Sequence, residues 1–309
     1  REDPREHVEV WKALSSITQQ EEVIETLKNA DAITTSVKRE NLKYLVPVIL
    51  KAWGDDPCTG KAIICCENVE NVGIYFKNLL MEQCSEKQKE NIQKIRIPNT
   101  IVDRICSMNS EDMTIVSEEF HELSVDKNVL SETGIEYINS IDNVEGHFYR
   151  KRYLLNSYAD AISFLAKKEG LTYLYEAAQN DKINEQIKPY MELLKDLLHE
   201  RYHISKEELE QWQEIYRKRL QNDKIPRELT TVARNLWEKL TVEERFVKPL
   251  IQLLEMKKDI AEGAKFIKKL IECGTEDEEL SQIKEKLMEI WNVCPEGEIL
   301  FNMIDKISD

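Results

Sequence analysis

The sequence predicts two domains, an α/β domain over residues 1–143 and an all-α domain over residues 144–309. In the first part, short apolar runs rich in β-forming residues alternate with helical patterns, which is the order of α/β units and favours a largely parallel sheet. From about Glu145 onward the helical periodicity is uninterrupted. A chain of 309 residues is long enough for two domains that each bury a core.

The elements of the α/β part follow from local patterns. Apolar runs predict strands at Asp31–Val37, Lys61–Cys66 and Lys94–Ile97. Apolar residues at helical spacing predict helices over Arg39–Trp53 and Val72–Cys84. Alternating faces over Thr114–Val125 predict one further strand.

The second part is predicted to hold helices only, with no strand longer than three residues. The predicted helices lie near 146–168, 171–180, 183–202, 205–221, 227–239, 242–256, 258–272, 276–291 and 298–307. No period of 20–50 residues repeats through them, so a compact bundle is favoured over a solenoid.

Composition excludes several classes of function. The net charge of −15 repels phosphate backbones and anionic lipids, so nucleic-acid and membrane binding are not expected. Apolar runs fall far short of the ~20 residues of a membrane span and no secretory leader is visible, which predicts a cytoplasmic protein. The seven cysteines lack C-x-x-C spacing and the five histidines lack H-E-x-x-H spacing, so no metal site is expected.

A polar turn follows the strand predicted at Lys61–Cys66 and contains Glu67 and Asn68. Parallel strands present ligand-facing groups at their carboxyl ends, and an Asn there can hydrogen-bond to a substrate hydroxyl. An Asn after a strand is also a common turn former.

A basic triplet near the start of the first long helix contains Lys151 between Arg150 and Arg152. These like charges would lower the pKa of Lys151 toward the range of a general base that removes a hydroxyl proton. The alternative is a solvated basic face near a helix start.

Two further clusters carry charge. Asp103 and Arg104 follow a strand-like segment and could orient a catalytic base or form a salt bridge. Arg245 and Lys248 are three residues apart, which on a helix would place them on one face toward an anionic substrate or toward solvent.

Taken in order, these segments resemble the polyol-specific long-chain dehydrogenases, and within them the mannitol-1-phosphate 5-dehydrogenases. The matching segments are DAITTSV at 31–37, IICCENV at 63–69, VDRI at 102–105, EEFHELSVDK at 118–127, RKRYLLN at 150–156 and ERFVKPL at 244–250. The likeness runs from about residue 12 to the end of the chain.

The resemblance implies a Rossmann-type domain that binds NAD, followed by a helical substrate domain, and interconversion of a polyol or polyol phosphate with the corresponding ketose. Lys151 matches the family's general base, and Asn156 and Asn68 match the residues that polarise the reacting oxygen. Asp103 matches the residue that supports the site. The cofactor-binding residues implied are Thr34, Thr35, Ser36 and Glu67, and the substrate-binding residues are Arg234, Arg245 and Lys248.

The sequence departs from the family pattern at several positions. Ala159 stands where the pattern has a His, Lys38 stands where the cofactor loop has a Gly, and Arg234 alone matches the arginines that precede the Lys-Pro-Leu segment. These departures favour an alternative, a catalytically degenerate homologue that binds a ligand or partner. An unrelated helical interaction module is a third reading.

The family's Gly-rich phosphate-binding turn has no counterpart here. The chain starts at Arg1, and none of its nine glycines forms a G-x-G pair. We therefore expect the first half of the nucleotide-binding domain to be lost, to be disordered or to lie outside this sequence. An incomplete sheet would expose an edge through which the protein could self-associate.

Overall fold

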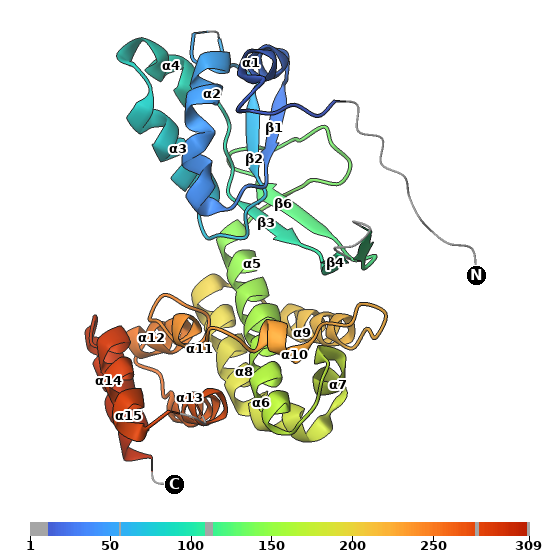
Figure 1. Cartoon of the computed structure of the whole chain (residues 1–309). Coiled ribbons are helices and arrows are strands. Elements are labelled where there is room, and N and C mark those ends of the chain that lie inside the picture. Colours follow the sequence, from blue (N-terminus) through green and yellow to red (C-terminus); the bar gives the residue numbers. More distant parts are fainter. Residues whose placement is uncertain (1–11, 56, 109–113, 276–277, 308–309) are drawn as a thin grey trace, which may run out of the picture. The chain divides into compact units, whose positions relative to one another are not determined.

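The computed structural model describes residues 12–55, 57–108, 114–275 and 278–307 (Figure 1). The chain forms two compact units, Arg1–Asp103 with Glu122–Val144, and Arg104–His121 with Glu145–Asp309. The first is an α/β unit and the second is mainly helical, which confirms the predicted fold class. The predicted domain boundary between residues 143 and 144 stays a prediction. In the structure, the segment Arg104–His121 packs with the helical unit although it lies before this boundary.

Two parallel strands form the centre of the α/β unit. β1 (Ala32–Thr35) pairs with β2 (Ala62–Cys65) in a register that runs from Ala32 opposite Ala62 to Thr35 opposite Cys65. Both strands confirm the sequence prediction. The strand predicted at Lys94–Ile97 is wrong, because Lys94 ends a helix and only Arg96 makes a parallel bridge to Ala62.

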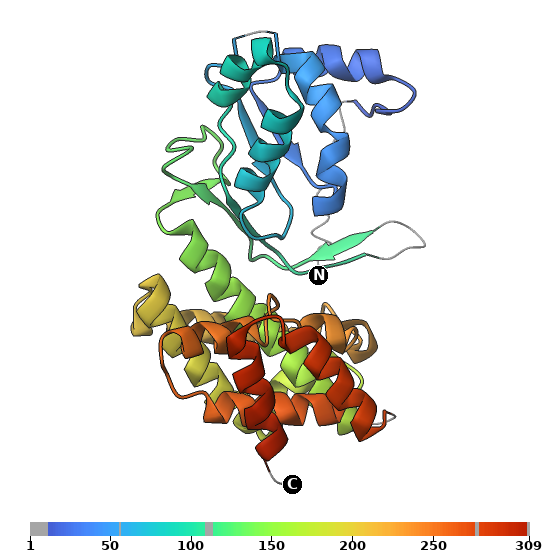
Figure 2. The ribbon, with the colours of Figure 1, turned by 90° about the vertical axis from the view of Figure 1, so that its left-hand side faces the viewer.

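Helices cover one face of these strands, as Figure 2 shows. They are α1 (Gln20–Lys28), the 3-10 helix η1 (Arg39–Tyr44), α2 (Val46–Trp53), α3 (Val72–Gln83) and α4 (Glu86–Lys94). Ile63 and Cys65 of β2 pack with them in one core, whereas Ala62 and Ile64 pack into a second cluster on the opposite face. Strand β2 is therefore buried on both faces, as expected of an inner strand.

The start of α3 is tied to the loop before the next strand. The Asn99 side-chain oxygen accepts hydrogen bonds from the backbone N–H groups of Gly73 (3.1 Å) and Ile74 (3.3 Å). A Cβ on Gly73 would lie 2.3 Å from the Pro98 carbonyl oxygen, so only Gly allows this approach. The contact fixes the loop that follows β2 against the loop that precedes β3.

The remaining strands pair mostly antiparallel. β3 (Thr100–Asp103), β6 (Glu122–Asp126) and β7 (Asn139–Ile141) form one sheet, in which β3 and β6 are antiparallel and β6 and β7 are parallel. β4 (Cys106–Met108) and β5 (Ile115–Ser117) form an antiparallel pair.

The single strand predicted over Thr114–Val125 is wrong. It is divided into β5 and β6, which belong to different units. The physical reason is the buried Glu118 between them, whose carboxylate pairs with Arg219 of the helical unit. This ion pair interrupts the extended backbone, and with it the alternation of faces on which the prediction rested.

The helical unit begins with a continuous run of helix formed by α5 (Val144–Lys151), the π-helical stretch η2 (Arg152–Ser157) and α6 (Tyr158–Lys168). The other helices are α7 (Leu174–Gln179), α8 (Asp181–Tyr202), α9 (Lys206–Leu220), α10 (Leu229–Val232), α11 (Leu236–Lys239), α12 (Lys248–Glu255), α13 (Ala261–Gly274), α14 (Leu280–Trp291) and α15 (Pro295–Lys306). Among the described residues after 145 there is no strand, as predicted. The helix predicted over 227–239 is wrong, because Asn235 with φ 55° separates α10 from α11.

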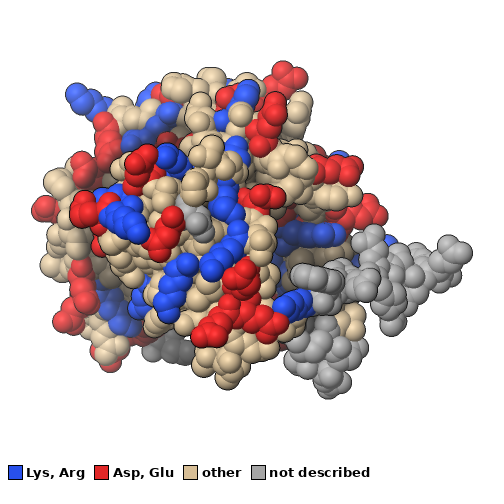
Figure 3. All heavy atoms as spheres, turned by 90° about the horizontal axis from the view of Figure 1, so that it is seen from above, with Lys and Arg blue, Asp and Glu red and all other residues tan. Residues whose placement is uncertain are grey.

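Charged side chains of both signs are intermingled on the face shown in Figure 3. Of the helices in the described part of the chain, none is long and apolar enough to cross a membrane.

Candidate active site

The predicted cofactor-binding residues of the α/β unit lie where β1 and β2 end. Thr35 and Glu67 are both buried, and the Thr35 hydroxyl donates to the Glu67 carboxylate at 2.7 Å. The other carboxylate oxygen accepts the Val37 backbone N–H at 2.9 Å. Thr34 and Ser36 are exposed on the same segment. Glu67 therefore joins the loop after β2 to the loop after β1.

We expect Glu67→Gln to loosen the loop after β1, because the amide replaces one accepting oxygen with a donor and removes the charge. Losing a hydrogen bond to a buried charged acceptor costs about 1.5–3 kcal/mol, so exchange of the Val37 amide proton should accelerate by roughly tenfold to a hundredfold. Glu40→Gln, which changes an exposed side chain of η1, is the matched control. Unchanged exchange at Val37 would contradict this role of Glu67.

The predicted catalytic residues of the α/β unit also lie at strand ends. Asn68 is exposed in the turn after β2, and Asp103 is the buried last residue of β3. The Thr100 hydroxyl at the start of β3 donates to the Cys65 carbonyl at the end of β2. Burial raises the pKa of the neighbouring Cys65 thiol to about 12, so it stays protonated at neutral pH. Arg104 donates through Nε to the Glu118 carbonyl at 3.0 Å.

Lys151 and Asn156 lie in one helical run of the second unit, and local helix geometry relates them. Lys151 is the last residue of α5 and is 5 % exposed, and Asn156 lies within the π-helical stretch. Asn156 follows Lys151 by five residues, and the backbone hydrogen bonds of a π-helix link residues at this same spacing. Within the same stretch the Ser157 hydroxyl donates to the Arg152 carbonyl five residues earlier, at 3.1 Å.

The two arginines beside Lys151 contact different elements. Arg150 is 1 % exposed, lies 3.7 Å from the ring centre of Trp212, and donates to the Tyr216 hydroxyl at 3.1 Å. Arg152 forms an ion pair with Glu244 at 3.0 Å. The alternative of a solvated basic face is therefore wrong, because Arg150 and Lys151 are both buried.

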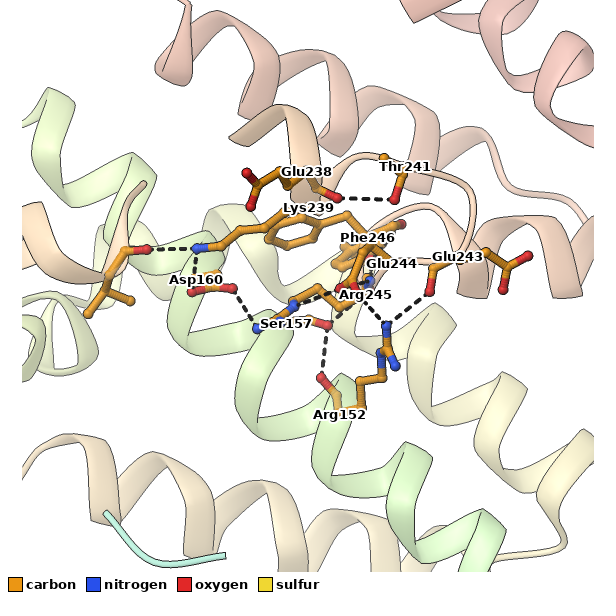
Figure 4. Close-up of polar contacts among 12 residues, drawn as sticks. Arg152, Ser157, Asp160, Glu238, Lys239, Thr241, Glu243, Glu244, Arg245 and Phe246 are labelled. Carbon is orange, nitrogen blue, oxygen red and sulfur yellow. Dashed lines mark hydrogen bonds and ion pairs between the residues drawn. The ribbon is translucent and has the colours of Figure 1, made fainter. Parts of the chain in front are cut away.

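Ion pairs join α6 to the end of α11 and to the segment between α11 and α12 (Figure 4). The Asp160 carboxylate contacts Lys239 Nζ at 3.0 Å through one oxygen and an Arg245 guanidinium nitrogen at 2.9 Å through the other. The Ser157 Oγ atom also lies 3.0 Å from the Arg245 carbonyl oxygen, so its single proton is shared between this oxygen and the Arg152 carbonyl. Glu244 lies between Arg152 and Arg245 and pairs with both.

A cavity of about 360 Å³ opens beside these ion pairs. Its lining residues are Asp160, Arg227, Thr231, Val232, Arg234, Asn235, Glu238, Lys239, Glu244 and Arg245. Burial lowers the pKa of Lys239, and the Asp160 carboxylate opposes this effect. Burial likewise lowers the pKa of Arg227.

Of the three predicted substrate-binding residues, two line the cavity and one does not. Arg234 and Arg245 line the cavity. Lys248 instead pairs with Glu243 at 3.2 Å and lies over the Tyr149 ring. The predicted common helix face of Arg245 and Lys248 is wrong, because α12 begins only at Lys248.

Sequence reasoning missed Asp160 and Lys239. Asp160 stands in the apolar run Tyr158–Ala166, which is buried throughout. A carboxylate in such a run needs a cationic partner, so its presence was a readable signal, although the identity of the partner was not.

Among the described residues, no group of three His, Cys, Asp or Glu side chains could hold a metal ion. The helical unit places Arg234 and Arg245 at the cavity, and it carries Lys151 and Asn156 five residues apart in one helical run.

Comparison with known proteins identifies the family. The model for the mannitol dehydrogenase Rossmann domain matches residues 1–138, and that for the mannitol dehydrogenase C-terminal domain matches residues 143–289. Mannitol-1-phosphate 5-dehydrogenases of Caldanaerobacter subterraneus and Pyrenophora tritici-repentis are 29% and 26% identical, each over 80% of this chain and 66% of its own length.

The chain thus spans just under two thirds of the length of these relatives. Among solved structures, Pseudomonas fluorescens mannitol 2-dehydrogenase in a ternary complex with NAD and D-mannitol superposes with a TM-score of 0.72 at 13% identity. The match covers 95% of this chain and 74% of that one, which supports the fold. With both domain models matched in order, the chain belongs to the mannitol dehydrogenase family.

Proposed function

We propose that the protein is an NAD-dependent oxidoreductase that interconverts a polyol or polyol phosphate with the corresponding ketose, with Lys151 as the general base. One observation carries the proposal: in a chain of the mannitol dehydrogenase family, Lys151 is buried at the end of α5 and Asn156 follows it by five residues in the π-helical stretch. The names of the relatives support the substrate class, and the complex of mannitol 2-dehydrogenase with NAD and D-mannitol supports NAD as the cofactor.

The residues at the ends of β1 and β2 fit a dinucleotide. Thr34 and Ser36 present exposed side chains with hydroxyl groups, and Glu67 holds the loop that carries Ser36. Hydroxyl groups after a parallel strand are suited to hydrogen-bond to such a ligand. When bound, NAD supplies the acceptor for the hydride that leaves the substrate carbon.

The chain's own residues would handle the proton and the orientation of the substrate. Lys151, when neutral, accepts the proton of the reacting hydroxyl. Asn156 hydrogen-bonds to the oxygen of that group. The roles of Asn68 and Asp103, which belong to the α/β unit, stay predictions. Arg234 and Arg245, which line the cavity, bind the rest of the substrate, and the role of Lys248 stays a prediction.

Two accompanying expectations concern the protein's surroundings. β1 pairs with β2 along one side in the described part of the chain, and Ala32 and Thr34 of β1 are exposed, so self-association through this strand remains a prediction. Cytoplasmic localisation likewise remains a prediction.

The test combines a binding and a rate measurement on the purified chain. We expect calorimetry to detect NAD binding, and NADH absorbance to rise when mannitol or mannitol 1-phosphate is added with NAD. Wild type with NAD but without polyol is the control. NAD binding without turnover would favour the degenerate homologue, and the absence of both would refute the proposal.

A further inference from the structure

Asp160 is a buried carboxylate placed among cations that face a cavity. Its side chain is 8 % exposed, and each of its two oxygens contacts a different cation, Lys239 or Arg245 (Figure 4). All three residues line the same cavity. The two Asp160 oxygens therefore occupy the positions at which the oxygens of a bound anion would contact Lys239 and Arg245.

Both cations already use part of their hydrogen-bonding capacity inside the protein. Besides Asp160, Lys239 donates to the Val232 carbonyl at 2.7 Å. Arg245 contacts Glu244 through its Nε atom at 3.4 Å. An anion that reached either donor would have to displace Asp160 or lie against its charge, and like charges in a poorly solvated site repel strongly.

We propose that Asp160 is an internal counter-ion that occupies the anion-binding positions of this cavity, so that the protein selects a neutral polyol over its phosphate. The substrate assignment rests on the proposed function. Asp160 is then a specificity-determining residue that acts through Lys239 and Arg245.

Charges of both signs line the cavity. Four basic residues (Arg227, Arg234, Lys239 and Arg245) and three acidic residues (Asp160, Glu238 and Glu244) line it. A phosphate monoester carries about −1.5 to −2 charges at neutral pH and needs several uncommitted donors. Polyol hydroxyls both donate and accept, so they can hydrogen-bond to carboxylates and guanidinium groups alike.

The test uses inorganic phosphate as the probe and the Asp160→Asn variant. Removing the charge frees donors of Lys239 and Arg245, so phosphate should bind at least about tenfold more tightly to the variant than to wild type, the effect of one charge-assisted hydrogen bond. Calorimetric titration at constant ionic strength measures this, and the thermal midpoint should rise with phosphate in the variant only. Glu243→Gln, which alters an exposed carboxylate outside the cavity lining, is the matched control.

Two results would overturn the inference. The first is that wild type binds phosphate as tightly as Asp160→Asn does. The second is that Asp160→Asn is well folded and gains no affinity for phosphate. If Asp160→Asn does not fold, the double variant Asp160→Asn with Lys239→Gln takes its place, because it loses one charge of each sign. The inference then requires the double variant to bind phosphate more tightly than wild type.

Turnover provides a separate readout of specificity. The ratio of kcat/KM for mannitol 1-phosphate to that for mannitol should rise at least about tenfold in Asp160→Asn. A wild type that prefers mannitol 1-phosphate would overturn the inference. If no protein turns over either substrate while the difference in phosphate binding holds, the proposed function fails and the counter-ion role of Asp160 stands.

Discussion

Replacing Lys151 with Ala is expected to lower kcat by about 10²–10⁴-fold, the contribution that a positioned general base makes to proton transfer. The hydroxyl proton must leave as hydride departs, and without the amine water would have to accept it. NAD affinity should change little, because the predicted cofactor residues belong to the α/β unit. The wild-type rate should rise with pH, since only the neutral amine accepts a proton, and the variant should lose this dependence.

The experiment needs a control for the burial of Lys151. Lys151→Met keeps most of the side-chain volume and should lose as much turnover as Lys151→Ala, although it should be more stable. Lys167→Ala, at an exposed position late in α6, should leave kcat unchanged. Equal rates for wild type and Lys151→Ala from pH 6 to pH 10 would eliminate Lys151 as the base.

The strands β1 and β2 could be predicted because local pattern and tertiary environment agree. Both are short runs of apolar and β-branched residues with turn residues after them, and β2 is buried on both faces. The side chains at their ends followed from that prediction, since parallel strands deliver Thr35 and Glu67 to neighbouring loops.

The segment Thr114–Val125 shows why the prediction failed elsewhere. Its alternation of residues is real, but the ion pair of Glu118 with a residue 101 positions later decides its conformation. Local periodicity carries no information about such a partner. The prediction of a strand at Lys94–Ile97 also failed, because Lys94 is the last residue of α4.

The candidate site was only partly accessible from the sequence for similar reasons. A spacing of five residues between Lys151 and Asn156 does not place them on one face of an α-helix, and the π-helical stretch that follows Lys151 has no local sequence signal. The partners of Asp160 lie far along the chain, at Lys239 and Arg245. The sequence could indicate that Asp160 needs a cation, but only folding shows which cation it contacts.

The ion pair of Glu118 with Arg219 should be among the most stabilising polar contacts of the helical unit. Arg219 donates to the two Glu118 carboxylate oxygens at 2.7 and 3.0 Å, and each side chain is 7 % exposed. The same carboxylate accepts the Ile105 backbone N–H at 2.6 Å, and the Arg219 guanidinium lies 3.9 Å from the Phe120 ring centre. These contacts hold the segment Arg104–His121 against α9.

Glu118→Ala is therefore expected to lower the free energy of unfolding by about 3–5 kcal/mol, because it removes the carboxylate that accepts two hydrogen bonds from a buried guanidinium. Urea unfolding measures this loss, and exchange of the Ile105 amide proton should accelerate in parallel. In the double variant Glu118→Leu with Arg219→Met no charge is left unpaired, so it should lose less stability than Glu118→Ala. If Glu118→Ala instead costs under about 1 kcal/mol, as exposed ion pairs do, the contact does not hold the segment and another interaction must position it.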